Sequence, residues 1–120
     1  DVLVLPTFAD TWGQVVSESM ACGLPVLGSR RSQAAEELVE DGVTGWLFDP
    51  VSQAEMETAI RTMLLTGEAA ILSMGAAAQA VARRLTPSES ADAMATAINA
   101  AQRILQLGGV AGRKASAAEF

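Results

Sequence analysis

Residues 1–29 read DVLVLPTFADTWGQVVSESMACGLPVLGS, in which apolar runs alternate with turn residues. Val2–Leu5 is a continuous apolar run closed by a proline, which is typical of a parallel strand buried on both faces. Gln14–Cys22 predicts a short helix, because Gly23 follows it and glycine is common just past a helix C-terminus. Pro25–Ser29 predicts a second short strand. The stretch therefore predicts strand, loop, helix and strand in succession.

Downstream of this stretch, helices alternate with one further strand. The helices are predicted over 34–40, 53–65, 68–85 and 86–107, and the strand over 45–48. Ser52 and Glu55 form a capping box at the start of the helix over 53–65, in which the serine oxygen accepts the amide of residue 55 and the glutamate reaches back. Thr86-Pro87-Ser88-Glu89 repeats the pattern, with Pro at the first helical position. We expect Gly108-Gly109 to end the last helix.

Two of the predicted helices show which side should face the core. Their apolar residues recur at the spacing of an amphipathic helix. These residues are Val15, Val16, Met20 and Ala21 in the first helix, and Met56, Ala59, Ile60, Met63 and Leu64 in the helix over 53–65.

The element order predicts an α/β fold. Short strands that alternate with helices form a parallel sheet with helices on its faces, as in Rossmann-like domains. Three strands are fewer than the roughly six of a complete doubly wound sheet, and the chain opens on an apolar run without Met. We therefore expect a fragment whose missing strands lie upstream, with a partial domain over 1–107 and a flexible tail over 108–120.

Composition and charge exclude several classes of function. The net charge is −6 with only eight Lys and Arg residues, which argues against a nucleic-acid partner because phosphate backbones need clustered positive charge. The chain has no His, which excludes a Ser-His-Asp triad. It also lacks an Asp-x-Asp pair, so we expect no metal site. The single Cys22 and the absence of a signal peptide favour a cytoplasmic protein.

The loop over 6–13 is the candidate site. In open parallel sheets, ligands bind beyond the carboxyl ends of the strands, and this loop follows the first strand. It carries Asp10, and Gly13 precedes the helix, whose first amides favour an anion. Glu18 lies about one turn into that helix and is suited to accept two sugar hydroxyls. These groups are suited to hold a nucleoside diphosphate sugar.

Three blocks of the sequence resemble retaining glycosyltransferases of family 4. Asp10-Thr11-Trp12-Gly13-Gln14-Val15-Val16-Ser17-Glu18 is similar to the family's motif of two acids separated by seven residues. Ser19-Met20-Ala21-Cys22-Gly23-Leu24-Pro25-Val26 resembles its E-A-M-A-x-G-x-P-V run. Residues 36–48, EELVEDGVTGWLF, resemble its E-L-V-x-x-G-x-x-G-x-L-F stretch. The resemblance covers residues 1–107.

The resemblance implies the C-terminal, donor-binding part of a two-domain GT-B enzyme. Asp10 would contact the transferred sugar as the catalytic residue, and Glu18 would bind the donor ribose. The backbone around Trp12 and Gly13 would lie against the donor, and Thr11 and Gln14 complete the implied donor-binding set. The family retains anomeric configuration and usually needs no metal or other cofactor.

The implied partners are a nucleotide-sugar donor, a sugar or lipid-linked acceptor, and the N-terminal domain of the same protein. We expect the protein in the cytoplasm, with a location at the periphery of a membrane as an alternative. Two departures from the family pattern concern the donor sugar. The first acid is usually Glu, whereas Asp10 is one methylene shorter, and a glycine turn is replaced by Ser29–Ala34, in which Gln33 could bond a donor hydroxyl.

Other interpretations of the same residues stay open. Without the motif, Asp10 would be a loop or capping residue and Glu18 a solvated acid on a helix. A nucleotide-sugar epimerase of GT-B architecture is a second enzyme hypothesis. A nucleotide-sugar-binding module without catalysis is the non-enzymatic hypothesis.

Overall fold

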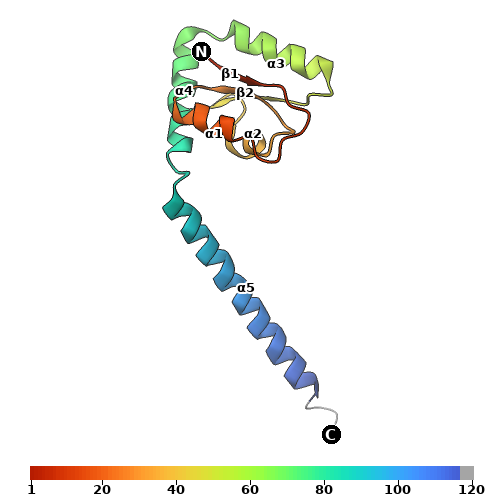
Figure 1. The fold of residues 1–120 in the computed structure, drawn as a ribbon. Coiled ribbons are helices and arrows are strands. Elements are labelled where there is room, and N and C mark those ends of the chain that lie inside the picture. Colours follow the sequence, from red (N-terminus) through yellow and green to blue (C-terminus); the bar gives the residue numbers. More distant parts are fainter. Residues whose placement is uncertain (117–120) are drawn as a thin grey trace. The chain divides into compact units, whose positions relative to one another are not determined.

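The computed structural model describes residues 1–116 (Figure 1). The chain divides into a unit over Asp1–Arg84 and a unit over Leu85–Phe120, and each is described by itself. The first unit contains β1 (Leu3–Leu5), α1 (Gln14–Ala21), β2 (Val26–Ser29), α2 (Gln33–Leu38), β3 (Gly45–Phe48), α3 (Gln53–Leu65) and α4 (Glu68–Ala82), and the second contains α5 (Pro87–Ser116).

The three strands form a parallel sheet in the order β1-β2-β3, which confirms the predicted α/β fold. All four residues of the central strand β2 are buried. The prediction that the first strand is buried on both faces was wrong at Val4, whose side chain is 48% exposed. Val4 pairs with Leu27 in β2, and α3 packs on β2 and β3 on the Leu27 side of the sheet. Val4 is therefore exposed because α3 does not extend over β1.

The helices cover both faces of the sheet. On one face, Val16 and Met20 of α1 pack with Val26 and with α2 and α4. On the other face, Leu27 packs with β3, α3 and α4. The burial of Val16 and Met20 was predicted correctly, whereas Val15 and Ala21 are exposed. The reason is that Val15 and Ala21 each lie about 100° around the helix axis from the neighbouring buried residue, outside the face that Val16 and Met20 share.

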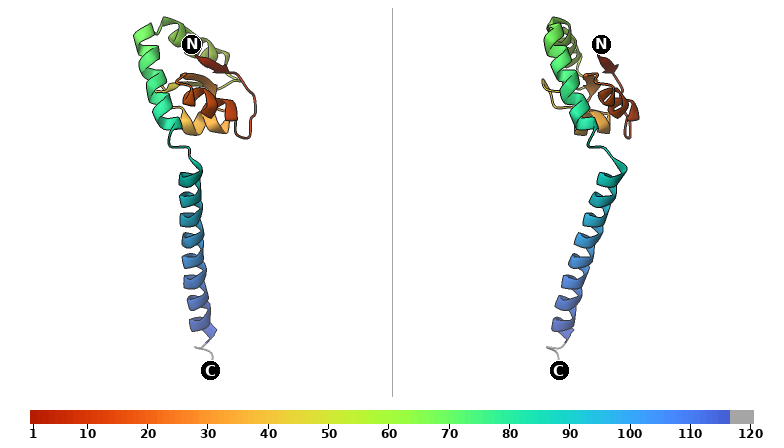
Figure 2. Two further views of the ribbon diagram at one scale, coloured as in Figure 1. Left: turned by 60° about the vertical axis from the view of Figure 1, so that its left-hand side comes forward. Right: turned by 90° about the vertical axis from the view of Figure 1, so that its left-hand side faces the viewer.

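α4 lies beside α1 and secures its C-terminal end (Figure 2). The amide Nε2 of Gln79 donates a hydrogen bond to the carbonyl oxygen of Ala21 at 3.0 Å. Gly23 follows with φ of 77°, in the left-handed region, as expected of a glycine just after a helix. The end of α1 is thus fixed by contacts from a distant part of the sequence, which holds the helix in place on the sheet.

α3 begins and ends at the predicted residues, but it buries less than predicted. Ala59 is buried and Met56 and Met63 are half-buried, whereas Ile60 is 43% and Leu64 is 73% exposed. The apolar stripe is therefore wider than the surface of the sheet that this helix covers. Taken singly, none of the helices in residues 1–116 is long and apolar enough to cross a membrane, and α3 and α4 pass that test only as a pair bent by 109°.

Ser52 caps α3, as predicted. Its hydroxyl oxygen accepts a hydrogen bond from the amide of Glu55 at 3.3 Å. The reciprocal bond is not formed, because the Glu55 carboxylate accepts the amide of Asp49 at 3.0 Å instead. Both bonds tie the turn after β3 to the first turn of α3.

We expect Ser52→Ala to lower the free energy of unfolding by about 1 kcal/mol, because a first-turn amide loses its acceptor. Ser52→Asp keeps an oxygen at the capping position and should stay near the parent value. Urea denaturation of the intact protein measures both changes. Equal midpoints for the two variants would show that the cap does not contribute.

α5 begins as predicted but continues further. The hydroxyl oxygen of Thr86 accepts the amide of Glu89 at 3.2 Å, and Pro87 is the first helical residue. The predicted end at Leu107 was wrong, since the helix passes through Gly108-Gly109 to Ser116. Each glycine costs a helix only about 1 kcal/mol relative to alanine, so the pair does not by itself end the helix. Of the predicted tail, residues 117–120 lie outside the described residues, and the domain boundary at 107 stays a prediction.

Candidate functional site

The loops that follow the three strands meet at one edge of the sheet, as the parallel topology requires. The amide of Asp10, after β1, donates to the carbonyl oxygen of Arg31, after β2, at 3.1 Å. The amide of Arg30 donates to the carbonyl oxygen of Phe48, at the end of β3, at 2.9 Å. Asp10 and Ser32 form an isolated parallel bridge beyond the strands. The loop that carries the predicted catalytic acid is therefore connected to its neighbour by backbone bonds.

The carboxylate of Asp10 lies against its own loop. Its Oδ1 atom accepts the amide of Trp12 at 3.2 Å, and the residue is half-buried. Its Oδ2 atom lies 3.1 Å from the position that a Cβ atom on Gly13 would take. This geometry fixes the side chain at the start of α1, where a carboxylate can meet a bound molecule.

Gly13 is the N-cap of α1 and has φ of 87°, which a residue with a side chain rarely adopts. No side chain caps this helix. The amide of Val16 donates to the carbonyl oxygen of Gly13 at 2.9 Å, so the donors left for a ligand are the amides of the first two helical residues. An N-terminus of this kind attracts anions through its amides and the helix dipole. The structure therefore places a half-buried carboxylate directly beside a group of backbone donors.

Gln14 and Glu18 lie on the exposed side of α1, opposite the buried Val16 and Met20. They are four residues apart, so their side chains share one face of the helix. Thr11 and Trp12 are also exposed. Five of the six predicted residues, 10–14, are thus contiguous at the strand end, and Glu18 follows one turn along the helix.

Gln33 takes part in a bond that the sequence did not indicate. Its Nε2 atom donates to the Glu37 carboxylate at 2.8 Å, along the surface of α2. The turn before it is held by Ser29, whose hydroxyl oxygen accepts the amide of Arg31 at 3.0 Å. The Arg31 side chain lies 3.7 Å from the carboxylate of Asp49 in the turn after β3.

Sequence reasoning missed Ser32. A serine before a helix predicts an N-cap, yet its side chain does not cap α2. The hydroxyl instead donates to the carbonyl oxygen of Trp12 at 3.1 Å. The only signal in the sequence was a serine at this turn, and a contact across twenty residues cannot be read from it.

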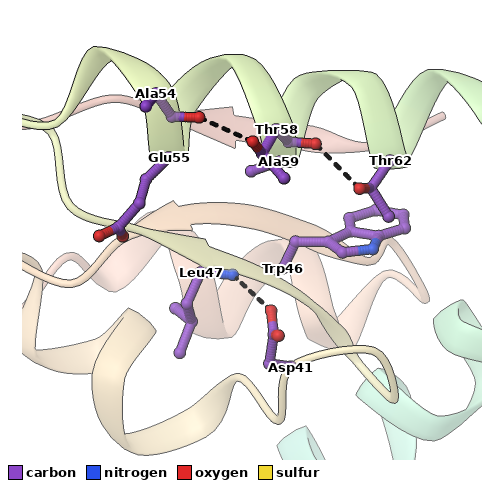
Figure 3. A pocket seen from close by; sticks show the side chains of 8 residues that line it. All are labelled: Asp41, Trp46, Leu47, Ala54, Glu55, Thr58, Ala59 and Thr62. Carbon is purple, nitrogen blue, oxygen red and sulfur yellow. Dashed lines mark hydrogen bonds between the residues drawn. The ribbon is translucent and has the colours of Figure 1, made fainter.

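A separate cavity of about 330 Å³ lies between β3 and α3 (Figure 3). Its acidic and hydroxyl side chains already have partners within the protein. The Asp41 carboxylate accepts the amide of Leu47 at 2.9 Å, and the hydroxyls of Thr58 and Thr62 donate to carbonyl oxygens of their own helix. This cavity contains none of the predicted site residues. Within residues 1–116, no cluster of three or more acidic, Cys or His side chains is arranged to hold a metal ion.

Comparison with known proteins places the chain in a family. A family model described as glycosyl transferases group 1 matches residues 1–80. The sulfoquinovosyl transferase of Arabidopsis thaliana is 41% identical over 66 residues, which is 53% of this chain. The chain spans only 13% of the length of that relative.

Solved structures show the same fold. Sucrose-phosphate synthase from Thermosynechococcus elongatus matches with a TM-score of 0.64 and 28% identity, over 91% of this chain and 26% of that chain. HepE of Anabaena in complex with UDP matches with a TM-score of 0.66 and 27% identity, over 83% of this chain and 28% of that chain. HepE in complex with UDP-glucose matches with a TM-score of 0.54 and 33% identity, over 63% of this chain and 20% of that chain.

These likenesses confirm the predicted fold class, since the structural neighbours are glycosyltransferases of GT-B fold. The family model covers 80 of the 120 residues, including the whole loop over 6–13 and all three strands. The chain belongs to the glycosyl transferases group 1 family.

Proposed function

We propose that this chain forms the donor-binding side of a retaining glycosyltransferase that moves a hexose from a nucleoside diphosphate to an acceptor hydroxyl. The observation that carries the proposal is the placement of the Asp10 carboxylate beside the uncapped N-terminus of α1, with Glu18 one turn further along. The UDP and UDP-glucose found in the HepE structures support a nucleotide sugar as the donor.

Each group has one part in the proposed site. Glu18 accepts the two ribose hydroxyls, and the first amides of α1, with the backbone of Trp12 and Gly13, face the donor. Thr11 and Gln14 border it. Asp10 orients the transferred sugar and stabilises the positive charge that develops on it, while fixed backbone donors stabilise the leaving diphosphate.

The remaining parts of the proposal rest on the family resemblance. The acceptor, a sugar or a lipid-linked sugar, binds to a part of the protein outside these 120 residues. Catalysis uses neither a metal nor another cofactor. The enzyme works in the cytoplasm, at the membrane periphery if its acceptor is lipid-linked.

Glu18→Gln tests the ribose assignment. The amide keeps the shape of the side chain but loses the charge, and charge-assisted hydrogen bonds contribute about 1.5–3 kcal/mol each. We expect the affinity for UDP to fall by about one to two orders of magnitude, at roughly 1.4 kcal/mol for each tenfold change. Isothermal titration calorimetry of the intact protein with UDP measures the loss.

Glu57→Gln is the matched control, because Glu57 is an exposed acid on α3, which packs on the other face of the sheet. It should bind UDP like the parent. If Glu18→Gln also binds UDP like the parent, the ribose assignment is wrong. Conversion of UDP-glucose to an epimer without transfer to any acceptor would favour the epimerase hypothesis instead.

A further inference from the structure

Ser32 is completely buried, and its hydroxyl makes no capping bond with the helix that it precedes. The hydroxyl donates to the carbonyl oxygen of Trp12 at 3.1 Å, and the amide of Ala34 donates to the same oxygen at 2.7 Å. Two hydrogen-bond donors at the start of α2 therefore hold the carbonyl group of Trp12, in the loop over 6–13 that we call the donor loop. Of the two, only the hydroxyl can be removed by substitution of a side chain.

The residue that Ser32 holds, Trp12, also makes the hydrogen bond that orients the carboxylate of Asp10. The amide of Trp12 donates to Asp10 Oδ1 at 3.2 Å, while its carbonyl oxygen accepts the Ser32 hydroxyl. The backbone of Asp10 is itself held between Arg31 and Gln33, since its amide donates to Arg31 and its carbonyl oxygen accepts the amide of Gln33 at 3.4 Å. A shift of Trp12 would move the donor that fixes the carboxylate.

Ser32 also lies against Gly13. A Cβ atom on Gly13 would overlap the Ser32 hydroxyl oxygen. The hydroxyl therefore occupies the space that a side chain on Gly13 would need. The same position lies 3.1 Å from Asp10 Oδ2. Ser32, Gly13 and the Asp10 carboxylate are therefore packed together around a single point at the start of α1.

We propose that Ser32 is a positioning residue for the transferred sugar. It fixes the Trp12–Gly13 peptide, and through the Trp12 amide it holds the Asp10 carboxylate in place. This inference rests on the proposed donor site. It concerns the transferred sugar rather than the ribose, because the Ser32 hydroxyl bonds the loop that carries Asp10 and not Glu18, the proposed ribose ligand.

The test is Ser32→Ala in the intact protein, with Ser29→Ala as its matched control. Both serines are completely buried in the same turn and each loses one hydroxyl, but Ser29 accepts the amide of Arg31 rather than bonding the donor loop. The rate of UDP release from UDP-glucose, with water as the acceptor, measures turnover. Calorimetry with UDP measures nucleotide binding, and amide hydrogen exchange of residues 10–13 measures the order of the loop.

We expect Ser32→Ala to lower kcat about tenfold, because a small displacement of a catalytic group is costly. The dissociation constant for UDP should change by less than about twofold, and exchange in residues 10–13 should become faster. Ser29→Ala should leave kcat and this exchange near the parent. Parental kcat and exchange in Ser32→Ala, or equal losses in both variants, would overturn the assignment.

The proposed function fails separately, if the parent protein neither binds UDP nor cleaves UDP-glucose. In that case amide hydrogen exchange of residues 10–13 tests the role of Ser32. Unchanged exchange in Ser32→Ala would show that the hydrogen bond to Trp12 does not order the loop. Faster exchange would show that Ser32 orders this loop, whose function would then be another one.

Discussion

Asp10→Asn is expected to lower the turnover of UDP-glucose by about two to three orders of magnitude, the loss typical of removing one group that stabilises a transition state. The amide keeps the size of the side chain and an oxygen for the Trp12 amide. It removes the negative charge that the proposed mechanism places beside the developing positive charge on the sugar. The effect should therefore appear mainly in kcat.

Asp49→Asn is the matched control for this loss. Like Asp10, Asp49 follows a strand and accepts the amide two residues ahead, that of Val51 at 3.2 Å. Its substitution should leave turnover within about threefold of the parent, because Asp49 has no part in the proposed donor site. Calorimetry with UDP gives a second criterion, since Asp10→Asn should bind this sugar-free nucleotide like the parent. A kcat unchanged by Asp10→Asn would remove Asp10 from the mechanism.

The order of the elements could be predicted from local patterns alone. Gly45–Phe48 and Gln53–Leu65 begin and end as predicted, because strong turn and capping signals flank them. Capping depends on residues within one turn, such as Ser52 and Glu55, so the sequence contains all the information required. The parallel sheet follows from alternation of strands and helices, which is also a property of short segments.

Burial was predicted less well, because it depends on what lies opposite each side chain. Val4 continues an apolar run, and Ile60 and Leu64 continue an apolar stripe, yet all three are exposed in residues 1–116. Periodicity shows which side of an element is apolar. It does not show how far the neighbouring element extends.

The candidate site also combines features that local sequence predicts with features that depend on the fold. The resemblance to the family motif proposed Asp10, Gly13 and Glu18 as site residues, and the structure places Asp10 and Gly13 at the start of α1 and Glu18 one turn along it. It did not identify Ser32, whose contact with Trp12 spans twenty residues. Residues proposed to touch the donor were found from a local motif, whereas residues that hold that motif in place can be found only from the fold.

Gly13→Ala is expected to lower the free energy of unfolding by about 3 kcal/mol and to abolish most of the turnover. Two causes act together. A residue with a side chain at φ of 87° is strained by about 1–2 kcal/mol, and a Cβ atom forced into a packed site costs about another 1–3 kcal/mol. That atom would overlap the Ser32 hydroxyl and crowd Asp10 Oδ2, so relief of the clash must displace the loop that forms the proposed site.

Gly42→Ala separates the two causes. Gly42 has φ of 77°, close to that of Gly13, but no atom lies within 4 Å of the position of its Cβ atom. Its substitution should therefore cost only the backbone strain, about 1–2 kcal/mol, and leave UDP-glucose turnover unchanged. The difference between the denaturation midpoints of the two variants measures the crowding at Gly13. If the two variants lose equal stability, the contact between Gly13 and Ser32 is not tight, and if Gly13→Ala retains full turnover, the loop does not form the donor site.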